Sequence, residues 1–376
     1  MKKLLILGSI AAPCPPKKQG GTERVAYYQA KQLAKNGIPS VFIGGVGTTK
    51  NFLDELKMEG ENVEDIFHQI DFVEIGGGTQ YGTAEDAQDH DPSLVEASRN
   101  MRRELVFMAL VQQYMYDKKS EYDVVLNNLR GASPLLQTAH TLGKTWINVM
   151  HLNIFPELAD LFKKYRAKII TIADHQRKEF PDLDYLATVY NPIDTSTFQF
   201  NETPNDYALM LGTIGYHKNQ KDAILAAKKA RIPLILAGKI RDQDYFDNEI
   251  KPHIENDKVQ YIGELNFETK MRLYKEASVF LFPIKWQEPF GLVVIEALAC
   301  GTPVIAYPHG GPTEIVQNGK NGYLVNSVDE MAIKIKEISQ ISRKYCRDDV
   351  KRRFDEDVIG KKYVDVVKDI YNTGYN

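Results

Sequence analysis

Cysteine is scarce in this chain of 376 residues. The three cysteines, Cys14, Cys300 and Cys346, are odd in number, far apart and free of any Cys-x-x-Cys spacing. A disulfide framework or a zinc site would need several cysteines at suitable spacing, so neither is indicated. We therefore expect a reducing compartment, and the cytoplasm fits best.

Long apolar runs and a strong net charge are also lacking. No window approaches the roughly 18 apolar residues of a membrane span, and the apolar run near Met1 reaches Gly8 too soon for a signal peptide. The formal net charge of −3 creates no field that favours nucleic acid. The length allows two or three domains, and a hydrophobic content of 43% supports sizeable cores.

Two glycine motifs for nucleotides are missing as well. The glycine-rich turns at 44–47 and 76–78 do not form Gly-x-Gly-x-x-Gly before a helix, so a dinucleotide fingerprint is absent. Gly143-Lys144-Thr145 resembles the end of a P-loop, but position 138 is Thr and the run leads into a strand pattern. We therefore exclude a P-loop.

The chain does contain a regular alternation of strand and helix patterns. The first series has strand patterns at 3–8, 40–44, 123–126, 145–150 and 168–173, and helical patterns at 22–36, 92–117 and 134–142. The second series has strand patterns at 207–212, 234–237, 259–263, 278–284 and 303–306, a helix at 219–230 and a helical tail at 329–371. The segment 195–205 between the two series is polar and aperiodic, and the alternation predicts an α/β protein with parallel sheets.

One stretch of the second series carries the chemistry. The strand pattern at 278–284 leads into a turn, and a helical pattern then begins near Gly291 and Leu292. Their N–H groups and the positive end of the helix dipole form a ready site for an anion. Glu288 precedes this helix and Glu296 lies about one and a half turns inside it. A carboxylate repels phosphate, so both are better explained as acceptors of hydroxyl hydrogen bonds.

This string resembles the Glu-x7-Glu motif of retaining, nucleotide-sugar-dependent glycosyltransferases of family 4. Glu288 and Glu296 stand at its ends, with Phe290, Gly291 and Leu292 between them. The resemblance implies that Glu288 contacts hydroxyls of the donor sugar, Glu296 contacts the ribose, and the intervening residues bind the diphosphate. It also implies the GT-B architecture, in which two Rossmann-like domains face each other across a cleft.

A buried helix with a fortuitous pair of glutamates is the alternative, since 26% of the residues are charged. The whole string, continuing through 299–306 and 319–325, is much rarer, and we favour the motif. The turn His309 to Glu314 starts another helix at a strand end; it could face the donor, and a simple turn explains it equally well.

A second string, Gly20-Gly21-Thr22-Glu23-Arg24, resembles the loop that follows the first strand in the same family and faces the reaction centre. The alternative is a flexible loop with Thr22 as helix N-cap and Glu23 in a favourable position for the dipole. We favour the functional interpretation for Gly21, as a donor-binding residue, and leave Glu23 open.

His151 directly follows the strand pattern at 145–150. Strand C-terminal ends bind ligands in open α/β sheets, although a lone histidine is more often structural. Family members often carry histidine here, near the donor sugar and the acceptor, so the resemblance implies a place in the active site. The resemblance does not require it as a general base.

The loop after the first strand of the second series resembles the family string Gly-Arg-x-x-x-x-Lys-Gly, whose Arg and Lys hold the donor diphosphate. Lys218 matches, while Thr213 stands at the Arg position and Asn219 at the last Gly. Threonine offers neither charge nor a bidentate fork. Either Lys239 or Arg241 supplies the missing cation, or diphosphate binding is weak. For Lys218 the alternative is a solvated loop lysine.

Asp-x-Asp strings occur at 89–91, 182–184 and 242–244, among other places. In a different transferase fold this spacing binds manganese, but several copies in one chain favour chance. Lys218 and a helix dipole can neutralise the diphosphate. We predict no metal and no cofactor, with the nucleotide diphosphate sugar as co-substrate.

The predicted domains are 1–191 on the acceptor side, 192–354 for the nucleotide sugar, and a helix at 355–376 that crosses back. The string 190–194 resembles the family's domain crossing. The basic turn at 163–166 could meet anionic lipid, although a solvated helix face explains it better, so membrane contact is at most peripheral.

The predicted function is a hexosyltransferase that moves a sugar, with retention, from a UDP- or GDP-sugar to an acceptor hydroxyl, which a sugar or another compound carries. Its predicted catalytic residues are Glu288, His151 and Lys218. The alternatives are a GT-B epimerase, a glycoside phosphorylase, and a degenerate nucleotide-sugar-binding protein, for which Thr213 is the hint.

Overall fold

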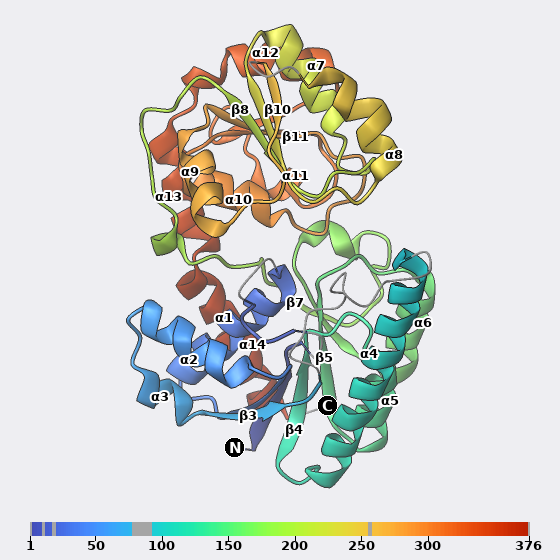
Figure 1. Cartoon of the computed structure of the whole chain (residues 1–376). Coiled ribbons are helices and arrows are strands. Elements are labelled where there is room, and N and C mark those ends of the chain that lie inside the picture. The colour runs from blue at the N-terminus through green and yellow to red at the C-terminus, as the bar shows by residue number, and fades with distance from the viewer. Residues whose placement is uncertain (1, 10–11, 17–19, 77–91, 255–257, 375–376) are drawn as a thin grey trace. The chain divides into compact units, whose positions relative to one another are not determined.

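The computed structural model describes residues 2–9, 12–16, 20–76, 92–254 and 258–374. It divides into two compact units (Figure 1). The first unit comprises Met1–Ile172, Arg177–Val189 and Gly360–Asn376, and the second comprises Ala173–Gln176 and Tyr190–Ile359. Each unit is described by itself.

The described part of the first unit contains a parallel sheet of seven strands in the order β3-β2-β1-β4-β5-β6-β7. Its strands are β1 (Lys3–Leu7), β2 (Ser40–Gly44), β3 (Ile70–Glu74), β4 (Tyr122–Asn127), β5 (Thr145–Met150), β6 (Lys168–Thr171) and β7 (Tyr185–Thr188). The central strands are nearly continuous apolar runs, because helices cover both faces of a doubly wound sheet.

Two sets of helices accompany this sheet (Figure 1). One set is α1 (Gly21–Lys35), α2 (Thr48–Met58) and α3 (Val63–Phe67), and the other is α4 (Pro92–Asp117), α5 (Ser133–Thr141) and α6 (Pro156–Tyr165). Side chains of α4, α5 and α6 share one hydrophobic core with Leu5, Val41 and Val125 of the strands. The end of α14 (Glu356–Thr373) also belongs to the first unit.

The second unit, in its described residues, holds a six-stranded parallel sheet in the order β10-β9-β8-β11-β12-β13. Its strands are β8 (Ala208–Leu211), β9 (Leu234–Ala237), β10 (Val259–Tyr261), β11 (Val279–Phe282), β12 (Val304–Ala306) and β13 (Gly322–Leu324). Its helices are α7 (Gln220–Ala230), α8 (Gln243–Tyr245), α9 (Phe267–Glu276), α10 (Leu292–Ala299), α11 (Pro312–Ile315), α12 (Val328–Lys336) and α13 (Arg343–Phe354).

Both sheets have a topological switch point, where the chain leaves one side of the first strand and resumes on the other. In the first unit β1 lies between β2 and β4, and in the second unit β8 lies between β9 and β11. Open α/β sheets bind ligands in the crevice outside the carboxyl ends of the strands at such a point. Binding sites are therefore expected in the loops after β1 and β4 and in those after β8 and β11.

The prediction of two Rossmann-like parallel-sheet domains is confirmed. The alternative in which Thr22 is the N-cap does not hold, because α1 already begins at Gly21 and Gly20 occupies the cap position. The tail is not one continuous helix. Ser342 caps α13 through its side chain, and extended backbone at Asp355 separates α13 from α14.

Within the described ranges, no helix combines the length and the apolar content needed to cross a bilayer. All three cysteines are free and buried. Burial raises the pKa of the Cys300 and Cys346 thiols to about 12, so both stay protonated at neutral pH.

Candidate functional site

An ion pair between Lys218 and Glu288 occupies the switch point of the second unit. Lys218 lies in the loop after β8, and Glu288 lies in the loop after the neighbouring strand β11. Lys218 Nζ donates to Glu288 Oε2 over 2.7 Å, and Trp286 Nε1 donates to the same oxygen over 2.9 Å. Their side chains are only 17% and 15% exposed, so water screens the pair weakly.

Aromatic rings hold the Lys218 ammonium in place. Its Nζ lies 5.2 Å from the centre of the Trp286 ring and 5.7 Å from that of Phe282. The His217 ring meets the edge of Trp286, and burial followed by the charge of Lys218 lowers the pKa of His217. The loop therefore presents one fixed positive charge, with a neutral imidazole beside it at pH 7.

Asn219, which departs from the family string, has a clear structural role. It caps α7 in the left-handed conformation, with φ of 60°, which glycine and asparagine adopt more easily than other residues. Its buried Nδ2 donates to the carbonyl of Pro283 over 2.8 Å. Asparagine thus replaces glycine here and also fastens the Lys218 loop to the end of β11.

The loops after β8 and β9 run side by side. The N–H of Ile214 donates to the carbonyl of Lys239 over 2.8 Å, and that of Arg241 donates to the carbonyl of Ile214 over 3.1 Å. The side chains of Lys239 and Arg241 are exposed. The structure therefore brings the backbone of both candidate cations next to the loop that carries Thr213.

The residues between the two glutamates have different surroundings. Gly291 is the N-cap of α10 with φ of 107°, a conformation that favours glycine, and Leu292 begins the helix partly buried. Phe290 is buried, and its ring packs against those of Tyr190 and Phe354. The side chain of Phe290 is therefore an internal anchor that fixes the chain just before the start of α10.

Glu296 is engaged by partners of its own. Its carboxylate accepts from Lys270 Nζ over 3.0 and 3.1 Å and from the Tyr274 hydroxyl over 2.9 Å. Burial, followed by the charge of Glu296, raises the pKa of Tyr274 well above its ordinary value. Glu296 is thus a partly buried carboxylate held by two donors from α9.

The glycine pair Gly310-Gly311 packs against the backbone of the Glu288 loop. A Cβ at Gly310 would lie 2.2 Å from the carbonyl oxygen of Glu288, and one at Gly311 would lie 2.2 Å from that of Phe290. The N–H of Gly311 also donates to the carbonyl of Glu288 over 2.8 Å. Both glycines therefore allow the close approach that fixes the Glu288 backbone.

In the first unit, His151 follows β5 and pairs with Asn128, which follows β4. His151 Nε2 lies 3.0 Å from Asn128 Oδ1, and Asn128 Nδ2 donates to Gln29 Oε1 over 2.8 Å. Burial, and then the charge of Arg130, lower the pKa of His151 to about 3. The ring is therefore neutral at pH 7, and its Nε2 donates because an amide oxygen only accepts.

Gly21 lies near the same switch point. It begins α1, after the loop that leaves β1, and the adjacent Thr22 Oγ1 accepts from Arg130 Nη2 over 2.9 Å. The first unit thus brings the start of α1 and the loop after β4 together. The donor-binding role of Gly21 stays a prediction, as do the roles of the other site residues.

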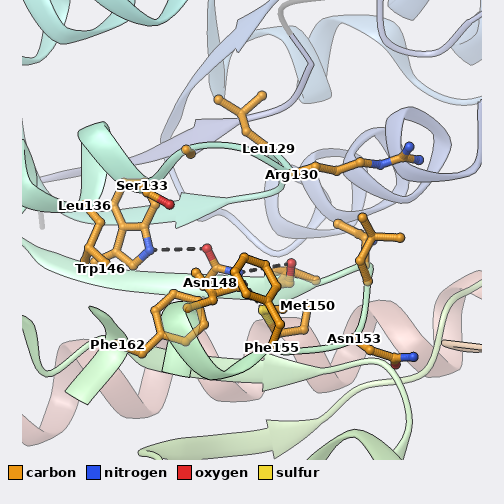
Figure 2. Close-up of a pocket in the computed structure, with 15 residues that line it drawn as sticks. Leu129, Arg130, Ser133, Leu136, Trp146, Asn148, Met150, Asn153, Phe155 and Phe162 are labelled. Atoms are coloured by element: carbon orange, nitrogen blue, oxygen red, sulfur yellow. Dashed lines mark hydrogen bonds between the residues drawn. The ribbon is translucent and has the colours of Figure 1, made fainter. Parts of the chain in front are cut away.

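A cavity of about 130 Å³ lies beside His151 in the first unit (Figure 2). Residues from the ends of β4 and β5 and from α5 and α6 line it. Figure 2 shows the rings of Trp146, Phe155 and Phe162 around it. Its position next to a predicted active-site histidine makes it a second candidate binding site.

The carboxylates that could suggest a metal have structural partners. Asp242 Oδ1 accepts from the N–H of Tyr245 and caps α8, and Asp184 accepts from Lys168 Nζ over 3.2 Å. The string Asp89-His90-Asp91 lies outside the described residues. In the described part of the chain, the strings at 182–184 and 242–244 form no assembled metal site.

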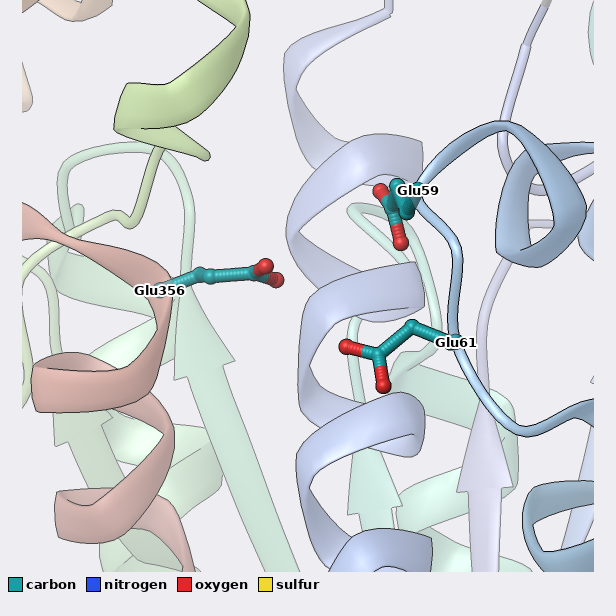
Figure 3. Close-up of side chains that lie close together, drawn as sticks. All are labelled: Glu59, Glu61 and Glu356. Atoms are coloured by element: carbon teal, nitrogen blue, oxygen red, sulfur yellow. The ribbon is translucent and has the colours of Figure 1, made fainter.

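Glu59 and Glu61 lie beside α1 in the first unit (Figure 3). Glu59 Oε2 accepts from Lys31 Nζ over 2.8 Å and from the Tyr27 hydroxyl over 2.6 Å, while Glu61 accepts from Lys35 Nζ over 2.7 Å. Lysines thus neutralise both carboxylates within their own unit. Glu356, also drawn in Figure 3, belongs to the second unit, and we assign no metal to these residues.

Known proteins resemble this chain in sequence and in fold. Residues 193–353 match the family model described as glycosyl transferases group 1. An uncharacterized glycosyltransferase of Methanocaldococcus jannaschii is 27% identical over 233 residues, which cover 54% of this chain and 60% of that protein. Glycogen synthase of Mycobacterium tuberculosis is 30% identical over 151 residues, covering 38% and 36%. The chain thus spans less than two thirds of both curated relatives.

The crystal structure of Anabaena HepE, in complex with UDP and glucose, superposes with a TM-score of 0.71. The alignment covers 98% of this chain and 100% of that chain at 18% identity. This similarity shows the fold, and the prediction of a GT-B architecture with two Rossmann-like domains is confirmed.

Proposed function

Because residues 193–353 match the family model described as glycosyl transferases group 1, we propose that the chain moves a sugar from a nucleotide diphosphate sugar to an acceptor hydroxyl. The observation that carries this proposal is the Lys218–Glu288 pair at the switch point of the second unit, with 2.7 Å between Nζ and Oε2. A cation for the diphosphate and a carboxylate for the sugar hydroxyls stand next to each other there.

Each member of the pair has a distinct task in this proposal. Lys218 carries three N–H donors, so it can keep Glu288 as a partner and still donate to a diphosphate oxygen. Glu288 retains acceptor positions for sugar hydroxyls, because one carboxylate accepts several hydrogen bonds. The helix start at Gly291 and Leu292 adds backbone N–H groups for the diphosphate. Glu296 would accept a hydrogen bond from a ribose hydroxyl in addition to those from Lys270 and Tyr274.

The proposed transfer proceeds with retention and without a metal. The bond between the anomeric carbon and the diphosphate oxygen breaks, and the acceptor oxygen forms its bond on the same face. The hydroxyl proton passes to the departing diphosphate, whose charge Lys218 stabilises. We place the donor on the second unit and the acceptor on the first, near the neutral His151.

UDP-sugars are the first donors to test, since the HepE structure contains UDP and glucose. GDP-sugars are tested beside them, since the predicted donor is a UDP- or a GDP-sugar. A degenerate binding protein is the second candidate, and the missing guanidinium at Thr213 is the observation that favours it.

The test is thermal stability with UDP, GDP, ADP and their sugar conjugates, each without and with EDTA. A ligand at about 100 times its Kd stabilises by about 2.7 kcal/mol, which shifts the melting temperature measurably. We expect one nucleotide family to raise it, with no effect of EDTA. Sugar transfer to an acceptor, with the product's anomeric configuration read by NMR, then completes the test.

Three results would contradict the proposal. An altered sugar formed without acceptor would indicate an epimerase, and turnover that depends on inorganic phosphate would indicate a phosphorylase. A melting shift with no turnover in any acceptor mixture would favour the degenerate binding protein. Loss of turnover with EDTA would contradict metal independence alone.

A further inference from the structure

The walls of the cavity in the first unit are mainly apolar. Leu129, Leu136, Trp146, Phe155 and Phe162 lie around it (Figure 2). Trp146 and Leu136 are almost fully buried, whereas Phe155 is half exposed at the surface. An apolar interior with an exposed aromatic residue is the arrangement that receives a ligand group from solvent.

Two polar side chains of the wall, Asn148 and His151, already have partners inside the unit. Asn148 Oδ1 accepts from Asn127 Nδ2 over 2.8 Å and from Trp146 Nε1 over 3.4 Å, and Asn148 Nδ2 lies 2.9 Å from Met150 Sδ. His151 pairs with Asn128 as described above. A sugar ring that enters this cavity would lose hydrogen bonds to water and regain few from these two side chains, which is unfavourable.

The charges of the residues that line the cavity also bear on which ligand fits it. Among the residues that line the cavity in the described part of the chain, Arg130 alone is charged, and its Nη2 donates to Thr22 Oγ1. No carboxylate lines the cavity there, although carboxylates are the usual acceptors for sugar hydroxyls. Among its described residues the wall therefore offers no charged acceptor to a hydroxyl-rich ring.

The volume sets the size of the occupant. The cavity holds about 130 Å³, and an apolar protein cavity of about 150 Å³ is known to bind benzene. We propose that this cavity binds one aromatic ring of the acceptor, so that the acceptor is an aryl-bearing alcohol or glycoside with its reacting hydroxyl outside the cavity, toward His151. This inference rests on the proposed transferase function.

The two tryptophans of the chain allow a direct binding test. Trp146 lines the cavity, while Trp286 lies at the Lys218–Glu288 pair of the second unit. In Trp286→Phe the fluorescence reports on the cavity alone, and in Trp146→Phe it reports on the donor site. The probe is 4-nitrobenzyl alcohol, a neutral ring with a hydroxyl whose nitro group quenches tryptophan on contact; glucose is the polar control.

We expect saturable quenching by 4-nitrobenzyl alcohol in Trp286→Phe and not in Trp146→Phe, with no effect of glucose in either. Adding Ser133→Leu, at the exposed first residue of α5 that lines the cavity, should weaken the probe at least about tenfold, as loss of fit in an apolar pocket does. Gln137→Leu, exposed one turn further along α5, is the matched control and should leave binding unchanged.

Absence of saturable quenching, or equal affinity in Ser133→Leu and Gln137→Leu, would overturn the aromatic subsite. The melting shift with UDP, measured on the unsubstituted protein, separates this failure from that of the proposed function. A UDP shift without ring binding removes the subsite alone. Ring binding without any nucleotide shift or transfer overturns the acceptor role that we assign to the cavity.

Discussion

At the switch point of the second unit, Lys218 and Glu288 form a partly buried ion pair, whereas at that of the first unit His151 and Asn128 share a hydrogen bond between neutral groups. The two sheets have the same kind of topology, so the difference comes from the side chains placed at the strand ends. One topology thus carries a charged pair at the switch point of one unit and a neutral, largely apolar site at that of the other.

The two sites also differ in the hydrogen-bond partners of their buried polar groups. In the second unit, Glu288 has Lys218 and Trp286 as donors, and Glu296 has Lys270 and Tyr274. Partly buried charges need such partners, because an unpaired one is strongly unfavourable. The first unit meets the same requirement with amides, which carry no charge to attract a diphosphate. This contrast supports the proposal that the donor binds to the second unit and the acceptor to the first.

The largest expected effect is the loss of turnover in Glu288→Gln. We expect turnover to fall about 10²- to 10³-fold, as when one electrostatic contact to the reacting group is lost, because the amide cannot supply the negative charge. Steady-state kinetics, with circular dichroism to check the fold, measure this. Glu268→Gln on the exposed side of α9 is the control and should keep full turnover. Near-normal turnover in Glu288→Gln would remove its catalytic role.

Lys218→Met tests whether the positive charge belongs to donor binding. We expect the Kd for UDP to rise about 10- to 100-fold, since a hydrogen bond to a charged group contributes about 1.5–3 kcal/mol. Calorimetry with UDP at low and high salt checks this. Lys320→Met, in the exposed turn before β13, serves as the matched variant. Equal affinities in the two variants would mean that Lys218 does not meet the diphosphate.

The neutral state of His151 in the first unit predicts that the free energy of unfolding depends on pH. Since the folded state lowers the pKa of His151 to about 3, its ring stays neutral when the unfolded chain takes up a proton below about pH 6.5. The unfolded state then binds more protons, so this stabilisation is complete above pH 6.5 and is lost as pH falls toward 3. The slope approaches about 1.4 kcal/mol per pH unit at most.

Urea unfolding of the native sequence and of His151→Gln at pH 7.5 and pH 5 measures this effect. The native protein should lose about 1–2 kcal/mol more than the variant over that interval. Equal losses would show that the folded protein protonates His151 like an exposed histidine. The first unit would then carry a charge at its switch point, and the contrast between the units would weaken.

The smallest expected effect concerns Lys239, the candidate substitute for the cation missing at Thr213. Because Lys239 is exposed, Lys239→Met should raise the Kd for UDP by only about two- to fivefold, the range of a solvent-screened ion pair. Thr213→Arg should lower it by restoring a guanidinium. Titrations of both variants, with Thr213→Gln as control, decide this. Unchanged affinity in Lys239→Met would leave Arg241 as the remaining candidate.

Much of the fold could be predicted because parallel strands are buried on both faces and so appear as short apolar runs. The central strands β1, β8 and β11 lie within their predicted ranges. The edge strand β7 was missed, because its residues are only partly buried and show no continuous apolar run. The final helix was predicted at 355–376, and α14 spans Glu356–Thr373.

Part of the site was predictable for the same local reasons. Lys218 and Glu288 were recognised within strings of neighbouring residues, and the structure joins them. Trp286 was missed, although an aromatic residue two positions before Glu288 was a visible signal. Asn128 was also missed, and the rule that ligands lie at strand ends, applied to β4 as it was to β5, would have found it.

Other partners had no signal in the sequence. Glu314 accepts from the N–H groups of Asp174 and His175, both over 2.8 Å, although the residues are about 140 positions apart. Burial alone would raise the pKa of Glu314, and hydrogen bonds from His175 and Asp174 instead lower it. Lys270 and Glu296 likewise meet only because α9 and α10 pack together. Pairings of this kind depend on tertiary packing, which no local pattern encodes.

The end of α14 has a consequence for the order in which the units are made. The segment Gly360–Asn376 belongs to the first unit, and Tyr363, Val364 and Val367 are buried there. The ribosome synthesises the whole second unit before it reaches this segment. The second unit can therefore complete its core while the chain is still growing, whereas the first unit, begun earlier, stays unfinished until α14 is released.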